Sequence, residues 1–386
     1  LEDRIILEGS KGGKDAIEVL RKMGTFLSGN MRASGVAITT KWDGAPAVIC
    51  GIDPADGQFF VGTKSVFAKD PKICKTEQQI NDMYGGGLAE KLKASLKYLP
   101  EVVTEGVLQG DLMFTNDKKN ERIKDENFIT FRPNTITYAA NPETKLGKAI
   151  NRAKIGIVFH TKYTGPSLPE MSASFNVTKN DFKTGGDVWA ERAEFQDISG
   201  AAGMNGSERR VYDTCVNQAE GSVKRASRIL DQIQSGKKAL EIDTEFLKFF
   251  NNYVKEGRPI PSVKKAYADY MFHLGKEFDK QIQKNKSLPA QEKKVSRFVQ
   301  TIEFITANET EFKMIIAAYM NLQKAKMILV EKMKKVSNLR LFVDKGGGNY
   351  EATTPEGFVA IVNDQATKLI DRMEFSKLNF TIEKIW

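Results

Sequence analysis

The stretch "ITTKWDGAPAVI", residues 38–49, sets the architecture expected for this chain. Two short apolar runs flank the pair Asp43–Gly44, a pattern that predicts two strands joined by a tight turn. Lys41 ends the first run, where strand periodicity favours a buried residue. A lysine amine becomes a nucleophile when desolvation or neighbouring cations depress its pKa. Lys41 is therefore the first candidate for chemistry, although K-x-D-G is also a common hairpin turn.

Strand-like patterning continues on both sides of this stretch. Strands are expected within 35–66, 106–114, 128–140 and 154–163, and again after Leu339 in "LRLFVD", "EGFVAIVN" and "ATKLI". The short connections between them favour antiparallel pairing. Apolar residues at helical spacing predict one helix at 14–28 and two short helices within 76–98.

The middle of the chain has a different pattern of apolar residues. From about 210 to 336 apolar residues recur every three to four positions, which predicts helices near 215–234, 243–256, 263–284, 289–306 and 309–336. The expected fold class is α+β, with a mixed, mainly antiparallel core and a large all-α insertion. In domain terms, residues 1–165 and 340–386 form the core, and residues 166–339 form the mostly helical insertion.

Composition limits the functional classes. The chain has 386 residues and is 41% hydrophobic, enough for a substantial core. Its three cysteines are scattered and accompanied by two histidines, which argues against a zinc site and favours a reducing, cytoplasmic location. No apolar run reaches the roughly 20 residues of a membrane span, and residues 1–30 lack the order of a signal peptide. A soluble protein with no membrane partner is expected.

The charge balance suggests a polyanionic partner. The formal net charge is +9 and the pI is near 9.1, and lysines that neutralise phosphates release counterions. Lysine-rich runs at 263–265, 292–297 and 331–335 could track a nucleic-acid backbone, or could simply be solvated helix faces.

The order of several short motifs gives a more specific indication. They are "KWDG" (41–44), "GTKS" (62–65), "QGDLMF" (109–114), "GIVFHT" (156–161), "EGFVAI" (356–361) and "ATKLIDR" (366–372). The series resembles the covalent nucleotidyltransferase superfamily of ATP-dependent DNA ligases, RNA ligases and mRNA capping enzymes. The resemblance covers roughly the first 165 and last 50 residues, and implies an ATP-grasp-like ligase core. Only 14 residues follow Arg372, too few for an OB-fold domain, so the resemblance is closest to RNA ligases.

The resemblance implies catalytic roles for two lysines. Lys41 matches the nucleophile that attacks the α-phosphate of a nucleoside triphosphate and holds the nucleotide as a phosphoramidate. Lys368 matches the first lysine of the last motif, which contacts the phosphates. Ile370 stands where the family has a second lysine, which leaves Arg372 or Lys377 as substitutes.

Further residues are implied to bind the nucleotide and a divalent metal, Mg²⁺ or Mn²⁺. Asp111 and Glu356 match the acidic positions that bind ribose or metal, and could otherwise be solvated strand-end carboxylates. Phe159 is the best match to the base-stacking aromatic, and could otherwise be core. The remaining nucleotide contacts expected are Thr40, Asp43, Gly44 and Lys64. His160 is interpreted as structural.

The expected activity is that of an ATP-dependent ligase of RNA or DNA. AMP would pass from Lys41 to a 5′-phosphate end and be displaced by a 3′-hydroxyl. A capping-type guanylyltransferase is the nearest alternative. Two others remain open: a nucleic-acid-binding or scaffold protein with an inactive core, and transfer of a nucleotide to a protein or small molecule. The oligomeric state is not predicted.

Overall fold

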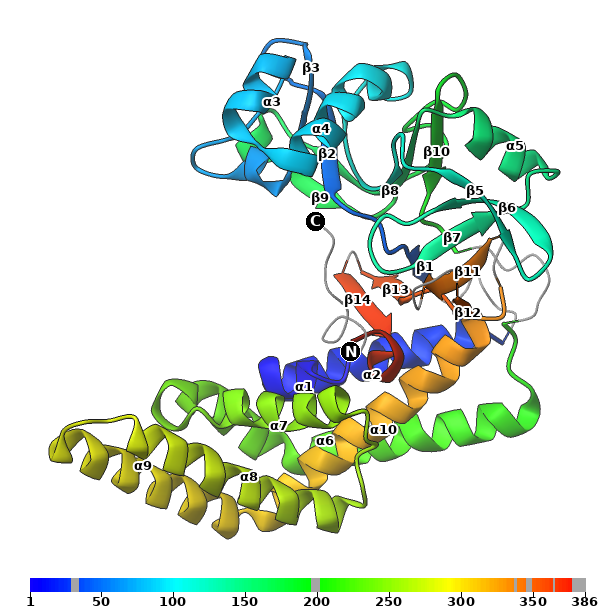
Figure 1. Ribbon diagram of the computed structural model, residues 1–386. Coiled ribbons are helices and arrows are strands. Elements are labelled where there is room, and N and C mark those ends of the chain that lie inside the picture. The colour runs from blue at the N-terminus through cyan, green and yellow to red at the C-terminus, as the bar shows by residue number, and fades with distance from the viewer. Residues whose placement is uncertain (29–34, 196–201, 337–338, 345–348, 364, 377–386) are drawn as a thin grey trace. The chain divides into compact units, whose positions relative to one another are not determined.

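The computed structural model describes residues 1–28, 35–195, 202–336, 339–344, 349–363 and 365–376 (Figure 1). The chain forms two compact units, each assembled from separated segments. Unit 1 comprises Leu1–Val36, Ser199–Lys335 and Thr367–Thr381, and unit 2 comprises Ala37–Ile198, Val336–Ala366 and Ile382–Trp386. No helix in the described ranges is both long and apolar enough to cross a membrane.

Unit 2 is built mainly on a six-stranded sheet. Its order is β10-β8-β4-β2-β3, with β9 paired to β8, and its strands are β2 (Ala47–Ile52), β3 (Phe59–Gly62), β4 (Val107–Phe114), β8 (Ile155–Thr164), β9 (Ser172–Ser174) and β10 (Val188–Arg192). β10 alone pairs in parallel in this sheet, with β8. The long connection between β8 and β10 makes a parallel return possible. The sequence-based expectation of an α+β fold with mainly antiparallel sheets is confirmed.

Helices cover one face of this sheet. They are α3 (Glu77–Met83) and α4 (Gly86–Tyr98). Ile80 and Leu92 from these helices pack with Val48 and Cys50 of β2 in one apolar cluster. α3 begins at a capping box in which Thr76 and Gln79 satisfy each other's backbone N–H groups. These contacts anchor β2, the strand that follows the segment carrying Lys41.

A second sheet of unit 2 is fully antiparallel. Its order is β12-β11-β7-β6-β5, and its strands are β5 (Lys119–Ile123), β6 (Glu126–Phe131), β7 (Thr137–Ala140), β11 (Arg340–Asp344) and β12 (Tyr350–Ala352). α5 (Lys145–Arg152) follows β7. Pairing of β11 with β7 joins Val336–Ala366 to unit 2, whereas Thr367–Thr381 belong to unit 1 and not to the core segment 340–386 expected from sequence.

β1 (Val36–Lys41) and β13 (Gly357–Val362) are neighbours in a third, three-stranded sheet. Its remaining strand, β14 (Gln365–Ile370), carries the chain across the boundary between the units at Ala366–Thr367. A π-helix follows at Arg372–Ser376.

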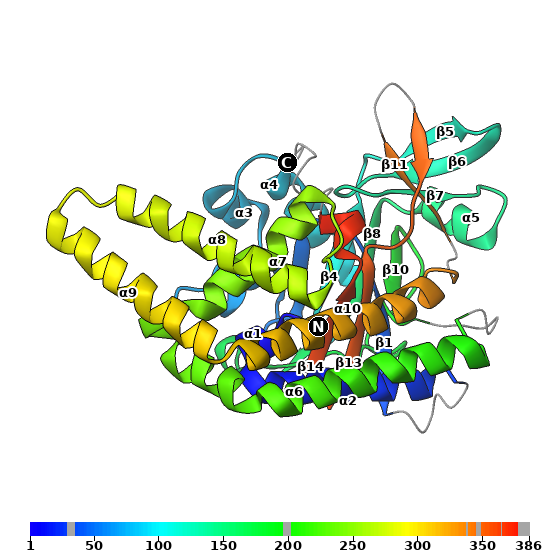
Figure 2. The ribbon, with the colours of Figure 1, turned by 90° about the horizontal axis from the view of Figure 1, so that it is seen from below.

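Unit 1 is helical. Its helices are α1 (Arg4–Leu7), α2 (Gly9–Phe26), α6 (Gly206–Leu240), α7 (Ile242–Glu256), α8 (Val263–Gln283), α9 (Leu288–Ala307) and α10 (Glu309–Met333). α2, α6 and α10 lie side by side, and α8 and α9 form a helical hairpin (Figure 2). The five helices predicted between 210 and 336 correspond to α6–α10.

The domain boundaries differ from those expected. Residues 1–36, assigned to the core from sequence, belong to the helical unit because α2 packs on α6, where the backbone N–H and hydroxyl of Ser10 both donate to Asp231 at 2.9 Å. Residues 166–198, assigned to the insertion, belong to unit 2 because β9 and β10 extend its sheet. The helical unit therefore contains the N-terminal segment and the part of β14 from Thr367 onward, as well as the predicted helical block.

Candidate active site

The K-x-D-G turn is fixed by its aspartate. The Asp43 carboxylate accepts hydrogen bonds from the Asn134 amide and from the backbone N–H groups of Thr135 and Ile136, all at 2.7 Å. The Asp43 backbone N–H donates to the Tyr138 hydroxyl oxygen at 2.7 Å. Asp43 is buried. The expectation that it contacts a nucleotide is corrected: its carboxylate is used to hold the turn against the loop before β7.

Gly44 lets this turn approach β4 closely. A Cβ atom at Gly44 would lie 2.5 Å from the Cβ of Asp111, so a larger residue would push the turn away. Immediately after it, the Ala45 N–H donates to the Leu112 carbonyl at 3.0 Å. Ala47 is paired with Asp111 in the sheet register. The turn and Asp111 are thus neighbours at one end of the six-stranded sheet.

Lys41 has a carboxylate as its partner. Its amine forms an ion pair with Glu356, which directly precedes β13. The Lys41 side chain is 26% exposed and that of Glu356 is 12% exposed. The ion-pair partner of this amine is therefore an acid and not a neighbouring cation. The ion pair holds the Lys41 side chain in position. It does not by itself activate the amine, because a paired ammonium has no lone pair for attack.

A pocket of about 260 Å³ lies beside Lys41, within unit 2. Its walls combine aromatic rings with charged groups of both signs. They include Thr40, Lys41, Trp42, Tyr138, Lys179, Trp189, Glu191, Arg192 and Glu194. Thr40 is held by a hydrogen bond from its backbone N–H to the Ala193 carbonyl at 2.7 Å. A partly apolar, partly charged pocket of this kind suits a small ligand with a flat ring and an anionic group.

The aromatic residues of this pocket contact one another. Trp42 stacks on Tyr138, with ring centroids 5.4 Å apart, and meets Trp189 edge-on at 6.2 Å. The Trp42 indole N–H is buried and has no hydrogen-bond partner among the described residues. An unpaired buried donor costs stability, so it points to a missing acceptor such as water or a ligand. Burial, and secondarily the charge of Asp43, raise the pKa of Tyr138 well above its usual value.

Asp111 is the candidate metal-binding carboxylate that remains partly exposed to solvent. Its side chain is 23% exposed, and the Nε2 of His160 lies 3.7 Å from its Oδ1. The described part of the chain contains no cluster of three or more His, Cys, Asp or Glu side chains that could hold a metal ion. Mg²⁺ needs only one or two carboxylates when substrate phosphates and water complete its shell. Asp111 fits that requirement, whereas the Glu356 carboxylate is occupied by Lys41.

Lys64 lies at the same end of the sheet. It begins the 3₁₀-helix Lys64–Phe67 directly after β3 and is exposed. Since Ile49 pairs with Gly62, the residues after β3 lie beside the start of β2. The residues after "KWDG", the "GTKS" segment and Asp111 therefore lie at the same end of this sheet.

Phe159 does not face a pocket, which corrects the base-stacking expectation. Its side chain is fully buried in the apolar cluster that joins the sheet to α3 and α4. Its ring lies 5.1 Å from that of Phe182. The aromatic surface next to Lys41 comes from Trp42, Tyr138 and Trp189, which sequence reasoning did not select. The signal available was Trp42, because it occupies the variable position of the K-x-D-G motif.

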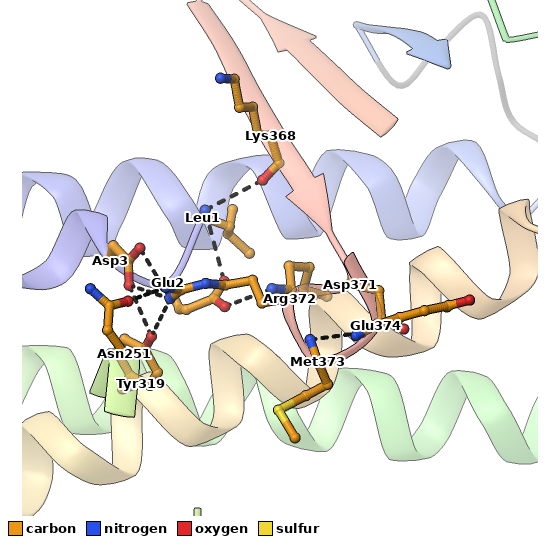
Figure 3. A network of polar contacts seen from close by, with 11 residues as sticks. Leu1, Glu2, Asp3, Asn251, Tyr319, Lys368, Asp371, Arg372, Met373 and Glu374 are labelled. Carbon is orange, nitrogen blue, oxygen red and sulfur yellow. Dashed lines mark hydrogen bonds and ion pairs between the residues drawn. The ribbon is translucent and has the colours of Figure 1, made fainter. Parts of the chain in front are cut away.

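Lys368 and Arg372 belong to unit 1. Figure 3 shows both residues with their polar neighbours. Lys368 is exposed on β14, and its carbonyl accepts a hydrogen bond from the Leu1 nitrogen at 3.4 Å. The Arg372 guanidinium donates to Asp3 at 3.2 Å and Tyr319 at 3.0 Å, and also to Asn251. Arg372 is thus held by a structural network, which corrects its assignment as a phosphate contact. Lys377 lies outside the described residues.

The comparisons with known proteins give a family and no function. The model of a family of unknown function, DUF6267, matches residues 1–384. The chain belongs to this family. No curated protein and no solved structure matches it.

Proposed function

We propose that this DUF6267 member is a covalent nucleotidyltransferase that acts as an ATP-dependent polynucleotide ligase. The observation that carries the proposal is the position of Lys41, whose amine lines an aromatic and charged pocket and is held there by Glu356. The motif series and the packing of the K-x-D-G turn against Asp111 add support.

The proposed reaction has three balanced steps. The neutral Lys41 nitrogen attacks the α-phosphorus of ATP, a P–N bond forms, the bond to pyrophosphate breaks and the amine loses a proton. An oxygen of a 5′-phosphate end then attacks the same phosphorus, and the amine leaves with a proton. Finally a 3′-hydroxyl attacks the 5′-phosphate, loses its proton and releases AMP.

Glu356 has a positioning role in this scheme. Its ion pair fixes the Lys41 amine at the pocket, and its carboxylate is the nearest group able to accept the amine proton. A divalent metal held at Asp111 would supply neutralising charge to the phosphates. Phosphoryl transfer depends mainly on such positioning and on charge stabilisation, which this chain's own side chains would provide.

Trp42 and Trp189 are the proposed base-binding surface in place of Phe159. Both line the pocket with Lys41, and base–aromatic stacking accepts any base. The unpaired indole N–H of Trp42 offers a hydrogen bond to a ring nitrogen or carbonyl oxygen of the base. Quenching of tryptophan fluorescence by nucleotide would report this contact directly.

Covalent labelling tests the proposal. The protein is incubated with magnesium and α-labelled ATP or GTP in separate reactions, and the denatured chain is examined by electrophoresis. Label from ATP that is lost in Lys41→Arg and kept in Lys179→Arg is expected, because both lysines line the pocket and only one is the nucleophile. Glu356→Ala should slow labelling.

Other outcomes point elsewhere. Label only from GTP would indicate a capping-type guanylyltransferase. No label from either nucleotide, in protein whose intact mass excludes a bound nucleotide, would reject the enzyme. Labelled protein that fails to join 5′-phosphorylated RNA or DNA ends would retain the nucleotide transfer and reject the ligase.

A further inference from the structure

A second pocket of unit 2, of about 650 Å³, is rich in lysine and is assigned no role by the motif series. Lysines reach it from three separate segments. Lys93 and Lys97 come from α4, Lys118 from the residues before β5, and Lys154 from the residues after α5. Thr115, Asn116, Asn151 and Tyr98 add neutral hydrogen-bonding groups.

Two of these lysines are available for an anionic ligand. Lys97 and Lys154 are exposed, and the structure gives neither an acidic partner among its described residues. Lys93 is paired with Glu90 at 2.8 Å. Glu77 also lines the pocket, so the four lysines exceed the two acids.

Lys118 has a positioning role. Its amine donates to the carbonyls of Ile150, Asn151 and Ala153 at 2.6–2.9 Å, and so caps the C-terminal end of α5. Burial and, secondarily, the charge of Lys154 lower the pKa of Lys118. This repulsion between two lysines would be relieved by an anion bound beside Lys154.

The pocket is connected to the candidate active site through two rigid elements. β4 carries Asp111 and leads directly to Thr115, four residues or about 13 Å away along an extended chain. Lys91, two residues before Lys93 on α4, donates from its amine to the Ala45 carbonyl at 3.0 Å, next to the K-x-D-G turn. Short stretches of β4 and α4 therefore join the lining of this pocket to Asp111 and to the K-x-D-G turn.

We propose that this pocket binds the phosphodiester backbone of the polynucleotide strand whose end is processed at Lys41. The inference rests on the proposed function for the identity of that strand. Separate lysines with Thr, Asn and Tyr side chains are the groups that contact phosphates and sugars without reading sequence. A pocket of about 650 Å³ with lysines from three separate segments suits an extended backbone better than a single phosphate.

Salt-dependent binding of a labelled single-stranded oligonucleotide with a 5′-phosphate tests the proposal. The variants are Lys97→Gln, Lys154→Gln and the double variant, and the control is Lys124→Gln with Lys224→Gln, two exposed lysines outside the pocket. Each phosphate contact contributes about −0.7 to the slope of log K against log salt concentration. In the double variant the slope should be less steep by about 1.4.

The same relation predicts about eightfold weaker binding per lysine at 50 mM salt, about 60-fold for the double variant, and little change at 1 M salt. The control should match the wild type. Running RNA and DNA oligonucleotides separately identifies the strand type. Unchanged affinity and slope in the double variant would overturn the proposal. So would equal loss of binding to polyglutamate, because the pocket would then recognise acidic protein.

Labelling at Lys41 separates the two proposals. The pocket variants should still take label from ATP, because Lys97 and Lys154 are not in the Lys41 pocket. Wild-type protein that takes no label but binds the oligonucleotide through these lysines would retain the backbone site and reject the enzyme. Wild-type protein that takes label but binds no oligonucleotide would retain the nucleotide transfer and reject the backbone site.

Discussion

Two lysine–glutamate pairs in this protein have the same chemistry and different surroundings. In unit 1, Lys326 contacts Glu2 at 2.6 Å, and both side chains are almost completely buried, at 2% and 1% exposure. In unit 2, the pair of Lys41 and Glu356 retains 26% and 12% exposure, and Lys41 lines a pocket. Removing the partner of a charge in a dry interior strongly lowers the free energy of unfolding. A charge beside a pocket can instead exchange its partner for a ligand. Burial therefore separates a structural pair from a candidate reactive one.

The largest expected effect comes from breaking the buried pair. Lys326→Met leaves the Glu2 carboxylate buried without its main partner, which should reduce the free energy of unfolding by about 3–5 kcal/mol. Urea unfolding followed by far-UV circular dichroism measures this loss, because the long helices belong to unit 1. The double variant Lys326→Met/Glu2→Leu should recover most of the loss. Failure to recover would mean that packing, and not charge, explains the single variant.

The matched change in unit 2 should be mild for stability. Lys41→Met should reduce the free energy of unfolding by about 1 kcal/mol or less, because partly hydrated pairs contribute little. The fluorescence of Trp42 and Trp189 follows unit 2 during urea unfolding. A loss as large as that for Lys326→Met would break the comparison, and would place Lys41 among the structural lysines.

Acid should affect the buried pair in a defined pH range. Burial opposes ionisation of Glu2, but the charge and hydrogen bond of Lys326 outweigh it and lower the pKa of Glu2 to about 2. The unfolded value is about 4.3. The stabilisation, about 3 kcal/mol, is therefore present above pH 4.3 and lost as the pH falls toward 2. The difference in unfolding free energy between wild type and Glu2→Gln, measured from pH 6 to pH 2.5, should shrink.

The turn beside Lys41 offers an intermediate effect. Asp43→Ala leaves the buried N–H groups of Thr135 and Ile136 without an acceptor, which should reduce the stability of unit 2 by about 2–3 kcal/mol. Nucleotide labelling should also slow, because the turn follows Lys41 directly. Asp43→Asn, which keeps one acceptor oxygen, should lose less of both. If labelling falls in Asp43→Asn with stability intact, Asp43 contacts the nucleotide after all.

The helical part of the fold was the most predictable from sequence. α7 to α10 each run for 15 residues or more with apolar residues at helical spacing, so their periodicity outweighs local ambiguity. β9 and β10 were missed, because Ser172–Ser174 has no apolar alternation and β10 owes its place to the sheet edge at β8. The assignment of residues 1–36 to the helical unit depends on packing between α2 and α6, which no local pattern encodes.

The candidate site was predictable only in part. Gly44 and Asp111 are neighbours, because the tight turn after Lys41 leads into β2, which pairs with β4. Phe159 could not be oriented from sequence, since every residue from Ile155 to Phe159 is buried and alternation is absent. The role of Asp43 depends on Asn134 to Ile136, more than 90 residues away along the chain.

The smallest expected effect concerns Trp42 and tests whether the unit 2 pair borders a ligand site. Trp42→Phe removes the unpaired buried indole N–H and keeps an aromatic ring, so the free energy of unfolding should stay within about 1 kcal/mol of the wild type. Affinity for a non-transferable ATP analogue should fall roughly twofold to tenfold, the contribution of one neutral hydrogen bond. Calorimetric titration measures the affinity, and Trp189→Phe serves as the control, because the Trp189 indole N–H is not among the unpaired buried groups of the described residues. Equal affinity for the analogue in Trp42→Phe and wild type would mean that the indole N–H does not donate a hydrogen bond to the nucleotide. The pocket beside Lys41 would then bind the nucleotide through the ring face and the charged groups alone.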